Sequence, residues 1–218
     1  MKASSTVSTN SFPSDDRVIA RRHTLKTLAG GIALAASGSV LGSQTLASQT
    51  INFYLSAVES TENSAPVSKS LALYNTHTGH TLDVQFHRDG KFDEDALEQL
   101  NIFLRDHREN EATVMDPMLY MQLWAIRETI SQSQVKNPVI HIISGYRTPK
   151  TNQMLREKSG GVAKNSYHMF GRAIDFRIPG VSTRGVRDIA RTFEAGGVGY
   201  YAGSDFVHID TGEKRHWG

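Results

Sequence analysis

The sequence predicts an α+β fold, in which a small antiparallel sheet carries a candidate site and helices pack on its other side. Two observations lead to this prediction. Strand-like apolar patterns recur along residues 71–210, and between them lie segments with apolar residues at helical spacing and a capping residue at the start. At 218 residues, 39% of them hydrophobic and 21% charged, the chain has the composition of one globular domain with a leader.

The first predicted element is a β-hairpin over residues 71–86, where two alternating runs flank Thr76-His77-Thr78-Gly79. Asp89-Gly90 predicts a second turn. A helix should follow, capped by Asp93 and running to about Arg105, because its leucines and Phe103 recur on one face.

The middle of the chain predicts two helices around a buried strand. Asp116-Pro117 opens one helix, and residues 139–143 (VIHII) form a continuous apolar run typical of a central strand. Thr148-Pro149 starts the other helix, with proline in the favoured first position, and Ser159-Gly160-Gly161 ends it.

The remaining elements are expected to alternate in the same way. Residues 172–178 read as a strand, a helix begins at Thr183 and ends at Gly196-Gly197, and residues 198–201 and 206–210 complete the sheet. We therefore expect one domain over residues 69–218.

The first 47 residues differ from the rest of the chain. Arg21-Arg22 is followed by Leu25-Lys26 and a weakly apolar run of small residues that ends in Thr45-Leu46-Ala47. This pattern resembles a twin-arginine export signal, so residues 1–47 are expected to engage the twin-arginine export machinery without forming a stable membrane anchor. The alternatives are a disordered start with a chance arginine pair, or an anchor that is not cleaved. Residues 48–68 are polar and predict a linker.

Charge and cysteine content exclude several classes of protein. The formal net charge of +2 comes from the leader, which holds five basic residues against two acidic ones, so the remainder is nearly neutral. A nearly neutral domain lacks the basic surface that nucleic-acid binding requires, which argues against a metal-dependent nuclease. Because the chain has no cysteine, disulfides and thiolate metal sites are excluded.

The residues with the clearest chemistry lie between 166 and 210. His168 and Asp175 flank Gly171, which suggests a loop that leads into a strand, and His208 follows on another strand. Two imidazoles and a carboxylate form a normal catalytic zinc set, because the ion keeps one position open for a water. On its strand, His208 shares a face with Asp210, which we expect to hold the histidine rather than the metal.

The motif in residues 166–175, Ser-x-His-x-x-Gly-x-Ala-x-Asp, followed by Asp-x-x-His in 205–208, resembles the zinc peptidases grouped with D-alanyl-D-alanine peptidases and murein endopeptidases. Residues 144–149 (SGYRTP) are similar to the arginine-bearing loop of that family, and the similarity to its periplasmic murein endopeptidase branch extends from about residue 70 to Trp217. The resemblance implies that His168, Asp175 and His208 bind Zn²⁺.

The resemblance also implies two catalytic residues. Asp205 takes the position of the general base, although many relatives have Glu there, and the alternative is a residue that caps a turn. Arg147 takes the position of the arginine that binds the substrate carbonyl or the developing oxyanion, and the alternative is a surface salt bridge. Trp217 and its neighbour His216 could line the groove.

The function expected from this resemblance is zinc-dependent hydrolysis of peptide cross-links in peptidoglycan, in the periplasm. Two alternatives remain open: a D-alanyl-D-alanine carboxypeptidase or dipeptidase, and a zinc-bearing module that binds peptidoglycan without turnover. An open groove for a polymer would favour the endopeptidase, but a sequence does not show the shape of a groove.

Overall fold

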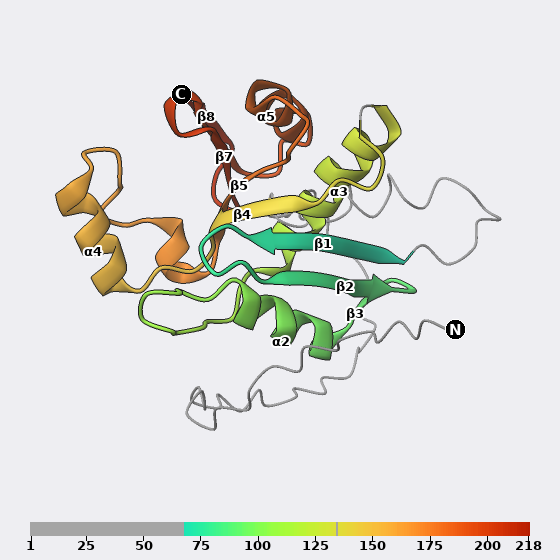
Figure 1. Cartoon of the computed structure of the whole chain (residues 1–218), viewed down its shortest axis with the longest axis horizontal. Helices are drawn as coiled ribbons and strands as arrows, with labels where there is room; N and C mark the ends of the chain where they lie inside the picture. Colours follow the sequence, from blue (N-terminus) through green and yellow to red (C-terminus); the bar gives the residue numbers. More distant parts are fainter. Residues whose placement is uncertain (1–67, 134) are drawn as a thin grey trace, which may run out of the picture. The chain divides into compact units, whose positions relative to one another are not determined.

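The structure is a computed structural model that describes residues 68–133 and 135–218, so the predicted signal (1–47) and most of the linker lie outside the described residues. These form an eight-stranded sheet, four α-helices and two short 3-10 helices (Figure 1). The strands are β1 (Lys69–Asn75), β2 (Thr81–Arg88), β3 (Lys91–Phe92), β4 (Ile140–Ser144), β5 (Ala173–Arg177), β6 (Gly197–Tyr201), β7 (Phe206–Asp210) and β8 (Arg215–Trp217). The helices are α2 (Glu94–Phe103), α3 (Pro117–Ser133), α4 (Pro149–Lys158), α5 (Thr183–Thr192), η1 (Tyr167–Phe170) and η2 (Ala202–Ser204).

The mixture of helices and strands is confirmed, but the prediction of a small antiparallel sheet is wrong. The strand order is β3-β2-β1-β4-β5-β7-β6-β8, and the pairs β1–β4 and β6–β8 are parallel. Between β1 and β4 the chain passes through α2 and α3, a connection long enough to return the second strand in the same direction. The strand β8 was not predicted, because three residues are too few to show an alternating pattern.

The predicted capping residues begin their helices as expected. Asp93 Oδ1 accepts a hydrogen bond from the backbone N–H of Ala96 at 2.9 Å, and Thr148 Oγ1 accepts one from the backbone N–H of Thr151 at 3.1 Å. Each side chain satisfies a backbone donor that the first helical turn leaves free. The helix α5 ends at Thr192, before the glycines that we expected to end it.

The predicted hairpin is also present, as β1 and β2. Its turn is held by Asn75, whose side-chain oxygen accepts hydrogen bonds from the backbone N–H groups of His77 and Thr78 at 3.0 and 3.1 Å. This side chain replaces the partners that the turn's backbone lacks, as asparagine commonly does.

The two faces of the sheet differ in character near β5 and β7. Ile174 and Phe176 on β5 and Val207 and Ile209 on β7 are buried in the hydrophobic core, to which α3 and α5 contribute residues such as Ile126, Ile130, Val186 and Ala190. Asp175 and His208 alternate with these apolar residues and therefore point to the opposite face.

The helix α4 lies beyond the end of the sheet at which β4 terminates (Figure 1). The loop between β4 and α4 therefore brings Arg147 close to the polar face of β5. Among the described residues, none of the helices has the length and hydrophobicity needed to cross a membrane.

Candidate metal centre

The three predicted metal ligands meet at one point. His168 Nε2 lies 3.2 Å from Asp175 Oδ1 and 3.3 Å from His208 Nδ1, and the latter two atoms are 2.8 Å apart. Across residues 68–133 and 135–218, this is the group of three histidine or carboxylate side chains with the spacing of a metal site. All three residues are buried, with exposed fractions of 1%, 3% and 8%.

These separations fit a zinc ion. Ligand atoms at about 2.0–2.2 Å from a tetrahedral zinc lie roughly 3.3 Å from one another. Two of the three separations are close to this value, and the third, between His208 and Asp175, is shorter at 2.8 Å. The donor set of two imidazole nitrogens and one carboxylate oxygen leaves a fourth position for water or substrate, as in catalytic zinc sites.

Two neighbouring strands and a tight turn bring the ligands together. Asp175 on β5 stands directly opposite His208 on β7 in an antiparallel pair, so the two side chains share a face. His168 lies on η1, which ends at Gly171 in the left-handed region with φ of 65°. A Cβ atom at this glycine would lie 2.5 Å from the carbonyl oxygen of Val114. The glycine of the motif is therefore required for the turn that leads the chain from His168 into β5.

Hydrogen bonds occupy the atoms of the ligands that face away from this point. His168 Nδ1–H donates to the carbonyl oxygen of Gly145 at 2.7 Å, and His208 Nε2–H donates to Asp210 Oδ2 at 3.0 Å. Arg147 donates from Nη2 to Asp175 Oδ2. These bonds leave His168 Nε2, His208 Nδ1 and Asp175 Oδ1 free to bind a cation, because each imidazole is held in the tautomer that such binding needs.

The same surroundings shift the pKa values of the side chains. Burial lowers the pKa of His168, so this imidazole is neutral near pH 7. Burial also opposes ionisation of Asp175, but its interactions with His168 and with the charged Arg147 outweigh it and hold the pKa of this carboxyl well below its usual range. Burial disfavours a charged His208, but hydrogen bonds to Asp175 and Asp210 outweigh it and raise the pKa.

Asp210 is the centre of a buried network, and this agrees with the expectation that it holds His208. It is fully buried, and Oδ1 accepts hydrogen bonds from the backbone N–H groups of Gly197 and Gly212 at 3.1 and 2.8 Å. Arg215 donates to both carboxylate oxygens at 3.0 and 2.7 Å. Arg215 was not among the residues predicted for the site. Arg215 follows closely after β7, which carries the last residues of the motif, and this closeness could have suggested a role for it. No short-range pattern in the sequence, however, shows that β8 pairs with β6.

A cavity of about 500 Å³ opens over the three ligands. Tyr201, Phe206 and Trp217 form an aromatic wall on it, in which the Trp217 indole N–H donates to the Tyr201 hydroxyl at 3.0 Å. The Trp217 ring lies 5.2 Å from the His208 ring, centroid to centroid. The prediction that Trp217 lines the groove is therefore confirmed, whereas its neighbour His216 is exposed and does not line the cavity.

The structure places the two predicted catalytic residues differently. Arg147 lines the cavity beside Asp175. Asp205 does not: its carboxylate accepts a hydrogen bond from the Thr183 hydroxyl at 3.1 Å and pairs with Arg177 at 3.5 Å, and its side chain is 64% exposed. Asp205 lies just before β7 in the left-handed region, with φ of 53°, and this backbone directs its side chain to Thr183 and Arg177 rather than to the ligand face.

Comparison with known proteins identifies relatives that cover most of the chain. Residues 63–217 match the model of a family described as "Peptidoglycan L,D-endopeptidase MepK". The protein of that name from Escherichia coli (strain K12) is 44% identical over 154 residues, which are 71% of this chain and 82% of the relative. The "Probable peptidoglycan L,D-endopeptidase MepK" of Haemophilus influenzae is 42% identical over 154 residues, with 71% and 81% covered.

Proposed function

The chain belongs to the peptidoglycan L,D-endopeptidase family of the peptidase superfamily that the motif indicated, and we propose that it hydrolyses peptide cross-links in peptidoglycan with a zinc ion held by His168, Asp175 and His208. The observation that supports this most directly is the convergence of the three inner ligand atoms at 2.8–3.3 Å from one another. The outer atoms of all three residues are already engaged, so little rearrangement is needed to bind the ion.

A zinc ion in this position would supply a water whose pKa is lowered to about 7 and would polarise the scissile carbonyl. The chain's own residues provide the orientation. His168 and His208 are held by Gly145 and Asp210 in the tautomers described above, and burial of the cluster excludes competing solvent. Electrostatic interactions in such a dry site are stronger than in water.

Arg147 is placed to stabilise negative charge on the substrate. Its Nε donates to Ser144 Oγ at 2.7 Å and Nη2 donates to Asp175, while Nη1 has no hydrogen-bond partner within the part of the chain that the structure describes. This free nitrogen belongs to a side chain that lines the cavity. It can donate to the carbonyl oxygen of the bond being cut, where negative charge develops during the reaction.

We retain Asp205 as the proposed general base, with a conformational change as a condition. Its neighbours Ser204 and Phe206 line the cavity, so the backbone at residue 205 is already at the rim. To accept a proton from the attacking water, the carboxylate must leave Thr183 and Arg177 and turn inward. Because both side chains of the ion pair with Arg177 are exposed, this contact is weak, and the hydrogen bond with the buried Thr183 is the main contact that must be broken.

The site of action follows from the substrate. Peptidoglycan lies outside the cytoplasmic membrane, and the arginine pair of the leader supports export to the periplasm by the twin-arginine route. Replacing Arg21 and Arg22 with lysine should leave precursor in the cytoplasm. Undiminished mature protein in the periplasm of that variant would contradict the proposed route.

The function is tested by incubating the purified protein with isolated peptidoglycan, with and without a chelator, and identifying the released fragments by mass spectrometry. We expect cleavage of cross-links that the chelator abolishes and that zinc restores. His168→Ala should lose most of the bound zinc and the cleavage. Full zinc occupancy in His168→Ala would show that the ligand assignment is wrong, and release of single terminal amino acids alone would favour a carboxypeptidase.

A further inference from the structure

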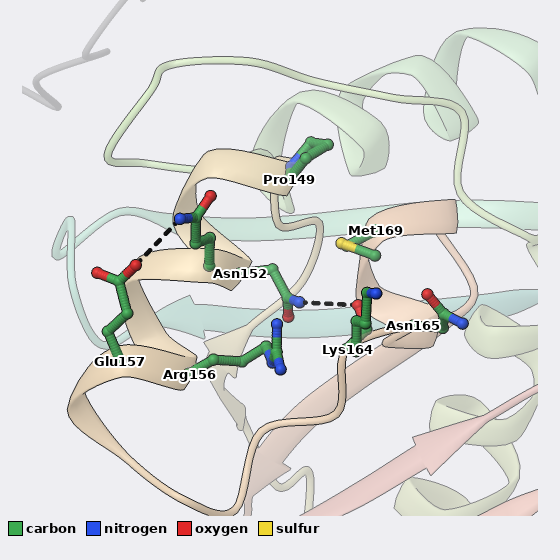
Figure 2. A pocket seen from close by; sticks show the side chains of 8 residues that line it. Pro149, Asn152, Arg156, Glu157, Lys164, Asn165 and Met169 are labelled. Atoms are coloured by element: carbon green, nitrogen blue, oxygen red, sulfur yellow. Dashed lines mark hydrogen bonds between the residues drawn. The ribbon is translucent and has the colours of Figure 1, made fainter.

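A second cavity, of about 380 Å³, shares a lining residue, Asn165, with the cavity over the metal ligands, and Figure 2 shows the side chains that line it. Its walls are the face of α4 that carries Asn152 and Arg156, and the segment that follows the loop after α4. The loop separates the two cavities: Ser159, Gly161 and Val162 line the cavity over the metal ligands, Lys164 lines the second one, and Asn165 lines both. A ligand that extends past Asn165 would therefore occupy both cavities at once.

The loop is fixed to α4 by Asn152. This residue is 2% exposed, and its Nδ2 donates to the carbonyl oxygens of Ala163 and Lys164 at 3.1 and 3.3 Å. Its Oδ1 has no hydrogen-bond partner among the described residues. An unpaired buried acceptor is rare in native proteins. At the wall of a cavity, it favours a ligand that brings an N–H donor.

The charges of the cavity favour a ligand with a carboxylate. Arg156 and Lys164 both line it and both are exposed. The side chains of these two residues make no hydrogen bond or ion pair with another residue in the described part of the chain. Figure 2 shows the Arg156 side chain reaching from α4 toward the segment that carries Lys164. The one acidic side chain that lines the cavity, Glu157, accepts a hydrogen bond at 3.0 Å from Nε2 of Gln153, which also lines the cavity.

We propose that this second cavity, defined by Asn152, Arg156, Lys164 and Asn165, binds the peptide on one side of the scissile bond, through a free carboxylate and a backbone N–H of that peptide. The inference rests on the proposed function. An enzyme that cuts within a cross-link needs a path for peptide on both sides of the cut, whereas one that removes a terminal residue needs a closed end. A cationic cavity that continues from the metal centre supplies such a path.

The test compares steady-state cleavage of a purified cross-linked muropeptide dimer by the wild type, Arg156→Ala and Lys164→Ala. We expect each variant to raise KM about tenfold with kcat within twofold, because the lost contact is a charge-assisted hydrogen bond away from the reacting atoms. The matched control is Lys158→Ala, which removes an exposed cation of the same helix that does not line the cavity. Zinc content, measured on all four proteins, should be equal.

A second substrate identifies the group that is recognised. The same dimer with its free carboxylates converted to amides should bind the wild type about tenfold more weakly, and on this substrate the Arg156→Ala variant should match the wild type. Arg156→Lys should restore part of the affinity for the free acid. A KM within twofold of the wild type for both alanine variants, with the wild type active, would overturn the proposed binding cavity. An inactive wild type with full zinc would instead overturn the proposed endopeptidase function.

Discussion

Replacing Asp210 with asparagine should weaken zinc binding although Asp210 does not touch the metal. In the wild type, Asp210 Oδ2 accepts from both His208 Nε2–H and Arg215. In the variant, the side-chain oxygen of the asparagine should occupy the Oδ1 position, because Gly197, Gly212 and Arg215 all donate hydrogen bonds there. Its NH₂ group then replaces Oδ2 and donates toward His208 Nε2. The imidazole can satisfy this donor by moving its proton to Nδ1, which is the atom that must be free to bind zinc.

The size of the effect follows from the kind of contact that is lost. Partners that orient a metal ligand typically contribute 10–100-fold in metal affinity, which corresponds to about 1.4–2.7 kcal/mol. The upper half of this range is expected here, because Asp210 is fully buried and no water can replace its carboxylate. Burial opposes ionisation of Asp210, but its hydrogen bonds with His208 and Arg215 outweigh it and lower the pKa, so the wild-type residue is charged at neutral pH.

The assay is competition for zinc between the protein and a chromophoric chelator, at pH 7 and constant ionic strength. The ¹⁵N shifts of the His208 ring report which nitrogen carries the proton. Asp188→Asn is the matched control, since it neutralises an aspartate that also pairs with an arginine but lies on the surface of α5. If Asp210→Asn has the unfolding free energy of the wild type and binds zinc with unchanged affinity, Asp210 does not orient His208 for the metal.

Three further predictions concern other parts of the domain. Asp205→Ala should keep its zinc but cleave peptidoglycan about 10²–10⁴-fold more slowly, and a rate within about threefold of the wild type would place the base elsewhere. Burial opposes ionisation of Asp106, but hydrogen bonds from Thr148 and from backbone N–H groups outweigh it and lower its pKa. The stabilisation that ionised Asp106 gives to the fold is therefore present above its unfolded pKa of about 3.9 and is lost as the pH falls through its folded pKa. In urea unfolding, Asp106→Asn should therefore lose less unfolding free energy between pH 7 and pH 3 than the wild type loses. Gly199→Ala should destabilise the domain by about 1–3 kcal/mol in urea unfolding, since its Cβ would lie 2.5 Å from the Trp217 ring, and unchanged stability would show that this ring moves freely.

Local signals in the sequence predicted much of the fold. The capping residues Asp93 and Thr148 and the turn over residues 76–79 depend on atoms a few residues away, so their patterns can be read without knowledge of the tertiary structure. Strand order depends on contacts between distant segments, and for that reason the parallel pairs β1–β4 and β6–β8 were missed.

The three metal ligands were predicted from their residue types and the motif, whereas the role of Asp205 was predicted from the family resemblance alone. The alternation that puts His208 and Asp210 on one face of β7 does not extend to residue 205, because this residue lies before the strand begins. The left-handed backbone at Asp205, which turns its side chain toward Thr183, has no comparable local signal.

Asp175 and His208 stand directly opposite each other across β5 and β7. A metal ion could therefore be bound by both residues only when the two strands are correctly aligned. A slip of one residue between these strands would turn His208 into the core and bring Val207 or Ile209 to the cluster, and neither can bind an ion. A zinc ion would therefore select the correctly aligned sheet from the collapsed states that precede it, because binding to one state alone lowers the free energy of that state alone. Loading with metal and completion of the sheet would then be a single event, and the amide protons of β7 should exchange with solvent more slowly once the ion is bound.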